Sequence, residues 1–113
     1  MNLQGQRAED LCADLLRRAG LRILARNWRC RLGEIDLVAE EGGTLVFAEV
    51  RLRRDPRYGG AAESVTAAKR ARLLAAARLY LAVRGTAACR FDVLLLDGLA
   101  ASRVQWIRNA FGE

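Results

Sequence analysis

The sequence predicts an α/β domain in which helices pack on a mixed sheet, in the order helix, three strands, helix, two strands. Three observations predict this fold class. The chain opens with an apolar stripe at helical spacing, continues with alternating apolar segments around Gly42-Gly43, and then places a second helical segment before a nearly continuous apolar run. Its length suits one modest core, so we expect a single domain over residues 1–113.

The first helix is predicted over residues 5–19, and Gly20 should end it. Glu9 falls at the margin of the apolar stripe on a helical wheel, whereas Asp10 and Asp14 point toward water. Glu9 is therefore the acidic residue that can reach an interior site. The stripe itself consists of residues spaced by three and four positions: Ala8, Leu11, Cys12, Leu15, Leu16 and Ala19.

Three strands should follow this helix. Residues 21–31 alternate in a strand-like pattern, which is less clean near Asn27. Residues 34–40 and 44–51 alternate on either side of Gly42-Gly43, a dipeptide suited to the positive backbone angles of a tight turn. These two segments predict a β-hairpin.

A two-residue turn fixes the register of this hairpin. Glu41 then pairs with Thr44, and the residue numbers of every cross-strand pair sum to 85. Asp36 therefore lies opposite Glu49. The two carboxylates should share a face with two apolar residues, Val38 and Phe47. The opposite face is wholly apolar and specifies the pairing: Ile35, Leu37, Ala39, Val46, Ala48 and Val50.

The second half of the chain begins with a charged loop, residues 52–60. Thr66 is suited to cap a helix that runs to about Val83, with Gly85 closing it. Residues 91–96 are nearly all apolar, which indicates a strand covered on both faces, and residues 104–107 indicate a short last strand.

The amino-acid composition restricts the partners and the kinds of catalysis that the chain can use. The chain carries a net charge of +6 from eighteen arginines and a single lysine, Lys69, which favours phosphate polymers as partners; solubility alone is the alternative explanation. The absence of histidine excludes Ser-His-Asp and Cys-His catalysis. The three cysteines lack the paired spacing of a zinc site or a disulfide framework, so we expect small buried apolar residues: Cys12, Cys30 and Cys89.

Asp36 and Glu49 form the candidate site. Facing side chains on paired strands hold their Cβ atoms about 4.5 to 5.5 Å apart, and like charges so placed repel. A cation or a shared proton would compensate two buried carboxylates, and a site with oxygen ligands alone favours Mg²⁺ or Mn²⁺ as the cation. The alternative is a structural network in which the two carboxylates pair with nearby arginines, namely Arg29, Arg31 or Arg51.

Several motifs run along the whole chain. They are Gly5-x-x-x-Glu9, the segment from Asn27 to Leu37 with Gly33-Glu34-Ile35-Asp36, the segment from Leu45 to Arg51, Lys69-x-x-Arg72, Arg90 to Val93, and Asn109-Ala110-Phe111. Read together, they resemble the YraN family of bacterial proteins. That family looks like Holliday-junction resolvases and the wider restriction-endonuclease-like group. The resemblance implies a restriction-endonuclease-like three-layer sandwich with a central mixed sheet, in the order α-β-β-β-α-β-β.

The resemblance also implies roles for four residues. Glu9 is the helix carboxylate, Asp36 and Glu49 are the central metal ligands, and Arg51 stands where the group usually has lysine. The implied activity is a Mg²⁺- or Mn²⁺-dependent endonuclease that hydrolyses phosphodiester bonds in branched or otherwise structured DNA. Symmetric cutting of a junction needs two sites, which a homodimer would supply.

Arg51 is the departure that matters most. Arginine stays protonated and presents a planar fork, so it can clamp a phosphate but is a poor proton acceptor. The alternative function is therefore a binding module for DNA or structured RNA that keeps the scaffold without effective catalysis. In the hairpin register Arg51 also faces Glu34, so a cross-strand ion pair is the structural alternative.

Phosphate contacts are expected from the loop beyond the hairpin and from the start of the second helix, whose N-terminus itself favours anions. An aromatic in the loop is suited to stack on an unpaired base, or else packs against the protein. For each basic candidate, the alternative is a charged side chain that lies in water and contacts no phosphate. The candidates are Arg53, Arg54, Arg57, Tyr58, Lys69, Arg70 and Arg72.

No segment approaches the roughly 18 consecutive apolar residues of a membrane span. Arg7, Glu9 and Asp10 lie where a signal peptide would be apolar. We therefore expect a cytoplasmic protein. Binding to a membrane surface is disfavoured, because the arginines do not gather on one face of a strongly amphipathic helix.

Overall fold

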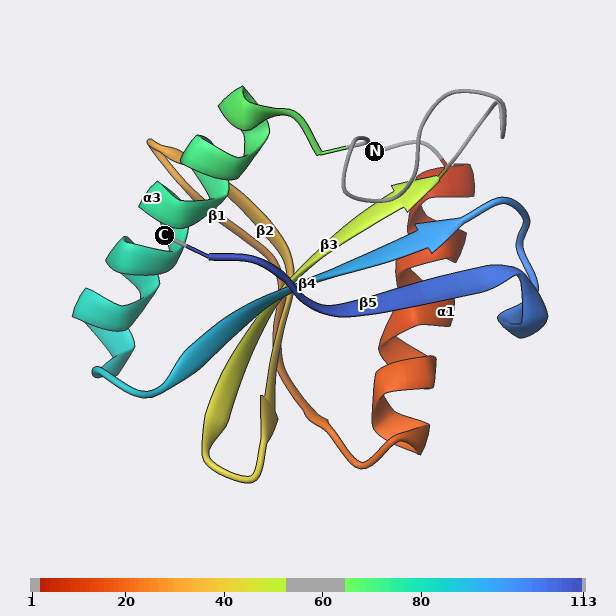
Figure 1. Cartoon of the computed structure of the whole chain (residues 1–113), viewed down its shortest axis with the longest axis horizontal. Helices are drawn as coiled ribbons and strands as arrows, with labels where there is room; N and C mark the ends of the chain where they lie inside the picture. Colours follow the sequence, from red (N-terminus) through yellow and green to blue (C-terminus); the bar gives the residue numbers. More distant parts are fainter. Residues whose placement is uncertain (1–2, 53–64, 113) are drawn as a thin grey trace.

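The structure, a computed structural model, describes residues 3–52 and 65–112. The predicted order α-β-β-β-α-β-β is confirmed, with one short 3-10 helix added before the last strand (Figure 1). The elements are α1 (Leu3–Arg18), β1 (Arg22–Cys30), β2 (Gly33–Glu41), β3 (Thr44–Leu52), α3 (Ala67–Arg84), β4 (Cys89–Leu96), η1 (Ala101–Arg103) and β5 (Val104–Phe111).

The five strands form one mixed sheet in the order β1-β2-β3-β4-β5. Only β3 and β4 pair in parallel, and the other neighbours are antiparallel. A parallel pair needs a crossover connection, which contains α3 here. Figure 1 shows α1 on one side of the twisted sheet and α3 on the other, which confirms the three-layer sandwich.

The first core lies between α1 and the sheet. Cys12, Ala13 and Leu16 of the helix are fully buried, and Gly20 ends the helix at a φ of 96° as predicted. Burying one leucine side chain stabilises a fold by about 2 kcal/mol, so this contact holds α1 in place and fixes the position of Glu9. The helix packs on residues of β2, β3 and β4: Leu37, Ala39, Val46, Ala48, Leu94 and Leu96.

The second core lies between α3 and the opposite face of the sheet. The helix begins as predicted, because the Thr66 hydroxyl accepts a hydrogen bond from the Lys69 backbone N–H at 3.2 Å. The Tyr80 ring meets the rings of Trp28 and Phe47 edge-on, with centroids 5.3 and 5.7 Å away. The other buried strand residues of this core are Ile35, Val38, Leu45 and Phe91.

The predicted hairpin register is confirmed over most of its length. Gly42 and Gly43 have φ values of 55° and 89°, which glycine adopts without steric cost. The paired residues run from Glu41 with Thr44 to Leu37 with Ala48. The strand pairing ends one step before Asp36 and Glu49, so their predicted cross-strand pair is not part of it. At that step the Asp36 side chain bonds the Val50 backbone N–H instead.

The face predicted for Ile35 was wrong. Ile35 packs on the α3 side of the sheet and Leu37 on the α1 side, although residues two apart in a regular strand share a face. The alternation breaks at the residue between them, Asp36. Across from it on β1 lies Asn27, with a left-handed φ of 51°. This break places Asp36 at a point from which both sides of the sheet are near.

The last strand is longer than predicted, because it continues past Ile107 through a second irregularity at Asn109, whose φ is 52°. At this irregularity the fully buried carboxylate of Asp92 accepts hydrogen bonds from the backbone and from side chains. It accepts the Asn109 backbone N–H at 2.9 Å, the Trp106 indole N–H at 2.9 Å and the Arg90 Nε–H at 3.1 Å. A charge this deep in a protein needs such partners.

Candidate functional site

Asp36 sits where regular strand alternation stops. Its Oδ2 accepts a hydrogen bond from the backbone N–H of Val50 on β3 at 2.8 Å, so a side chain takes up a strand donor at this end of the ribbon. Burial is the main cause that raises the pKa of Asp36; the bond from Val50 opposes it, and the nearby Glu34 carboxylate adds to it. The local backbone thus places a carboxyl group that resists ionisation.

Glu49 is the second carboxyl group of the predicted pair. Its position is fixed from the other side, because Glu49 pairs with Val93 of β4. Burial and the neighbouring Asp36 raise the pKa of Glu49 to about 8, although the positive charge of Arg51 opposes the shift. Two adjacent carboxyl groups that both resist ionisation bind a proton, or a cation that replaces it, more readily than isolated ones.

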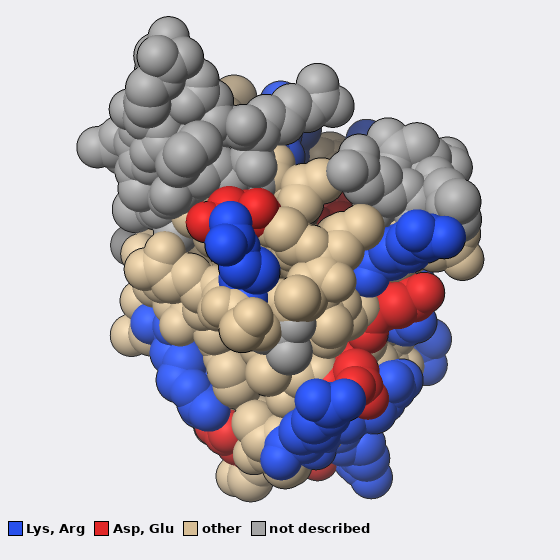
Figure 2. All heavy atoms as spheres, turned by 90° about the vertical axis from the view of Figure 1, so that its right-hand side faces the viewer, with Lys and Arg blue, Asp and Glu red and all other residues tan. Residues whose placement is uncertain are grey.

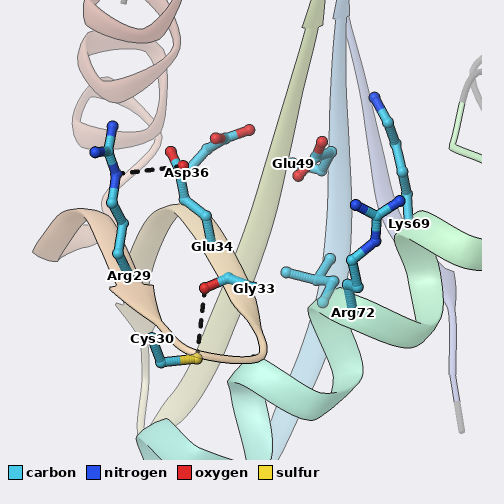
Figure 3. Close-up of a pocket in the computed structure, with 9 residues that line it drawn as sticks. Arg29, Cys30, Gly33, Glu34, Asp36, Glu49, Lys69 and Arg72 are labelled. Carbon is cyan, nitrogen blue, oxygen red and sulfur yellow. Dashed lines mark hydrogen bonds and ion pairs between the residues drawn. The ribbon is translucent and has the colours of Figure 1, made fainter.

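Two hollows flank this pair. The larger, about 440 Å³, lies on the α3 side and is lined by both Asp36 and Glu49 (Figure 3). The smaller, about 230 Å³, lies beside α1 and is lined by Glu9, Asn27 and Asp36. Asp36 therefore contributes to both, as its place at the strand irregularity allows.

Glu9 belongs to the smaller hollow. Glu9 is 4% exposed, and its carboxylate accepts hydrogen bonds from Arg26 Nε at 2.8 Å and from Asn27 Nδ2 at 3.0 Å. Burial, followed by the nearby Asp36 and Glu9, raises the pKa of the Cys12 thiol to about 12. The structure thus brings the helix carboxylate close to the site from the α1 side, but gives it a guanidinium partner.

Glu34 is a site residue that sequence reasoning missed. It lines both hollows beside Asp36, and Arg29 Nε lies 3.4 Å from its Oε2. The hairpin register predicted Glu34 as an ion-pair partner of Arg51, and no such pair is present among the described residues. Arg51 Nη1 instead lies 3.8 Å from Glu49 Oε1 on its own strand.

The opposite wall of the larger hollow is basic. Lys69 and Arg72 line it from the first two turns of α3, and Figure 3 shows them beside Glu49. The helix comes this close to β2 because Gly33 has no side chain: a Cβ there would lie 3.0 Å from the carbonyl oxygen of Arg72. Gly33 is thus a packing residue whose role only the folded structure reveals.

The other predicted contacts divide into two groups. Arg70 lies on a different side of α3 from the hollow, with its guanidinium 6.0 Å from the centre of the Phe111 ring. The remaining four fall outside the described residues: Arg53, Arg54, Arg57 and Tyr58.

Charge elsewhere on the surface is mixed. On the face shown in Figure 2, basic side chains lie in separate groups with acidic side chains beside them. Exposed ion pairs mix the two charges elsewhere on the described surface, for example Arg18 with Asp14 at 2.6 Å and Arg103 with Asp97 at 2.9 Å. Exposed pairs contribute little to stability and leave little unbalanced charge for a phosphate.

The pair of Asp36 and Glu49 fits a hard divalent cation, because it offers carboxylate oxygens whose repulsion a positive ion would relieve. Within residues 3–52 and 65–112, no group of three or more cysteine, aspartate and glutamate side chains is arranged to hold a metal ion. The role of Glu9 as a third ligand stays a prediction. No helix in the same ranges is both long and apolar enough to cross a membrane.

Comparison with known proteins gives a consistent result over almost the whole chain. This chain is 50% identical to a UPF0102 protein of Nitrosomonas europaea, over 97% of this chain and 94% of the relative. It is 48% identical to one of Methylobacillus flagellatus over 98% of both chains, and 53% identical to one of Methylococcus capsulatus over 96% of this chain and 89% of the relative. The model of the uncharacterised protein family UPF0102 matches residues 8–96. The chain therefore belongs to the UPF0102 family, the YraN family that its motifs resemble.

Proposed function

We propose that this protein is a Mg²⁺- or Mn²⁺-dependent endonuclease that hydrolyses phosphodiester bonds in branched or otherwise structured DNA. One observation carries the proposal: two adjacent carboxyl groups that resist ionisation, Asp36 and Glu49, line an open hollow whose opposite wall is basic. Carboxylates suit a cation and the basic wall suits a phosphate, so the hollow matches the two charged partners of metal-assisted phosphodiester hydrolysis.

Asp36 and Glu49 would hold the ion. When bound, a divalent cation supplies Lewis-acid chemistry, polarising the phosphodiester and lowering the pKa of a water molecule. The hydrogen bond from Val50 orients the Asp36 carboxylate, and the pairing of Glu49 with Val93 orients the second carboxylate. Such preorganisation is what a site for a charged transition state needs.

The basic side chains would bind the nucleic acid. Arg72 and Lys69 stand one turn apart on α3, at a helix N-terminus that already favours anions. Arg51 lies close enough to Glu49 to neutralise part of its charge and to restrict its movement. We propose a homodimer for the symmetric cutting of a junction. We also propose a cytoplasmic location, where the cysteines would stay reduced.

The proposal is tested with purified protein and labelled substrates: branched, flap, single-stranded and duplex DNA, and RNA. We expect cleavage that requires Mg²⁺ or Mn²⁺, prefers branched DNA and disappears in Asp36→Asn. Asp97→Asn is the matched control, since it removes an exposed carboxylate paired with Arg103. Absence of products with every substrate, in both metals and across protein concentrations, would refute the nuclease.

A second candidate function is a nucleic-acid-binding module without catalysis. The contact of Arg51 with Glu49 favours it, because a guanidinium beside the carboxylate supplies part of the positive charge that an ion would bring. This candidate predicts salt-sensitive binding of DNA or structured RNA and no thermal stabilisation by Mg²⁺. The nuclease predicts that Mg²⁺ stabilises the wild type and does not stabilise Asp36→Asn.

A further inference from the structure

We infer that Lys69, rather than Arg51, supplies the side-chain ammonium that contacts the scissile phosphate in this hollow. The inference rests on the proposed nuclease function and names one of its catalytic residues. By the family resemblance, the cationic position belongs to the strand residue two after Glu49. In this chain that residue is an arginine, and the ammonium comes from the opposite wall.

The placement of Lys69 is the first support. It lies in the first turn of α3, where the bond from its backbone N–H to the Thr66 hydroxyl fixes the start of the helix. Its side chain lines the same hollow as Asp36 and Glu49 (Figure 3). A phosphate lying between the carboxylate wall and the basic wall would therefore meet Lys69 on one side.

Composition is the second support. Lys69 is the only lysine among nineteen basic residues, so the one side-chain ammonium in the chain lies at the candidate site. An ammonium is a small point charge with three donors that can turn toward one oxygen, whereas a guanidinium is a wide planar fork. The lysine chemistry that position 51 lacks is thus present in the hollow, on another element.

The surroundings of the two cations are the third support. The guanidinium of Arg51 already lies 3.8 Å from Glu49. Lys69 is partly buried, and burial followed by the positive charge of Arg51 lowers its pKa. An ammonium in such a place gains from contact with an anion, because a phosphate would offset both the burial and the repulsion by Arg51.

The first test is a set of substitutions assayed for metal-dependent cleavage. We expect Lys69→Met to lower kcat at least 100-fold with DNA affinity changed less than threefold, and Arg51→Met to lower kcat less than Lys69→Met does. Arg51→Lys combined with Lys69→Met should recover at least tenfold over Lys69→Met alone. Arg84→Met is the control, since Arg84 is exposed at the other end of α3.

The second test needs no turnover. Reductive methylation with ¹³C-formaldehyde labels one lysine in the chain, so Lys69 gives a single side-chain NMR signal apart from that of the N-terminal amine. We expect this signal to shift when a phosphorothioate branched DNA is added, and to shift less with Asp36→Asn. Circular dichroism of each variant checks that it is folded.

The outcomes separate the inference from the proposed function. If the wild type cleaves and Lys69→Met cleaves equally well, or loses affinity as much as rate, the assignment of Lys69 is overturned and the nuclease stands. If the wild type cleaves nothing, the nuclease fails and the catalytic role of Lys69 fails with it. A Lys69 signal that does not respond to the bound DNA overturns the contact directly.

Discussion

Replacing Glu49 with glutamine should stabilise the metal-free protein at pH 8 and leave its stability at pH 5 nearly unchanged. The folded pKa of Glu49, about 8, lies above the value of 4.5 for an unperturbed glutamic acid. Between these values the folded chain binds a proton that the unfolded chain releases, so the free energy of unfolding falls as the pH rises. Glutamine does not titrate and removes this loss.

The size of the effect follows from the same shift. One pKa unit corresponds to about 1.4 kcal/mol, so a shift from 4.5 to about 8 has an upper limit of about 5 kcal/mol once the pH exceeds both values. Water entry and small movements around the ionised side chain relieve part of this cost. We expect Glu49→Gln to gain roughly 2 kcal/mol at pH 8, or about 8 °C in Tm.

The assay is urea unfolding of the wild type and Glu49→Gln in EDTA, at half-unit steps from pH 5 to pH 8.5. The difference between their free energies of unfolding should grow steadily with pH. Adding Mg²⁺ should then stabilise only the wild type, because the ion replaces the proton that glutamine cannot lose. Asp97→Asn, which removes an exposed carboxylate, is the control for the loss of one acidic side chain.

A difference that stays flat across this range would refute the reasoning. It would mean that Glu49 ionises at its ordinary pKa in the folded protein, with water or Arg51 compensating its charge fully. A cation between Glu49 and Asp36 would then gain nothing from the site, because the carboxylates would have no repulsion left to relieve.

Three further predictions concern the scaffold. Asp92→Asn should cost about 3 kcal/mol in urea unfolding, because it leaves Arg90 beside a buried neutral group, and a cost below 1 kcal/mol would show that Asp92 does not hold the β5 irregularity. Gly33→Ala should cost about 1 to 3 kcal/mol by pressing on the Arg72 carbonyl, while Gly112→Ala, which meets open space, should be neutral; equal stabilities would contradict the close packing. In native protein at pH 8, Ellman's reagent should modify the exposed Cys89 and spare Cys12, whose thiol is buried with a pKa of about 12; a Cys12→Ala variant that loses a fast-reacting thiol would disprove this.

The sequence predicted the features that depend on neighbours along the chain. The Gly42-Gly43 turn, the helix ends at Gly20 and Thr66, and the register near the turn follow from local backbone chemistry, and each is present in the structure. The register in turn predicted which two carboxylates lie at the end of the ribbon. Local rules were sufficient there, because a hairpin pairs residues that are close in sequence.

What the sequence did not reveal depends on contacts between distant elements. The face of Ile35 was predicted wrongly because strand alternation breaks at Asp36, opposite the left-handed Asn27 on another strand. The apolar periodicity of one segment does not show such a break. The role of Asp92 was hidden inside an apolar run, since two of its three donors come from β5. Glu34 and Gly33 gain their roles only when α1 and α3 pack beside them.

The strand order has a consequence for how the protein folds. Because β1, β2 and β3 are neighbours in both chain and sheet, they form a meander with short-range contacts, whereas β4 joins only after a long crossover. We expect the acidic ribbon to form early, during synthesis from the N-terminus, and the lysine-bearing helix to dock later. A nascent chain would thus hold its two carboxyl groups together before Lys69 and Arg72 complete the opposite wall of the hollow, so the candidate site would assemble only when folding is nearly complete.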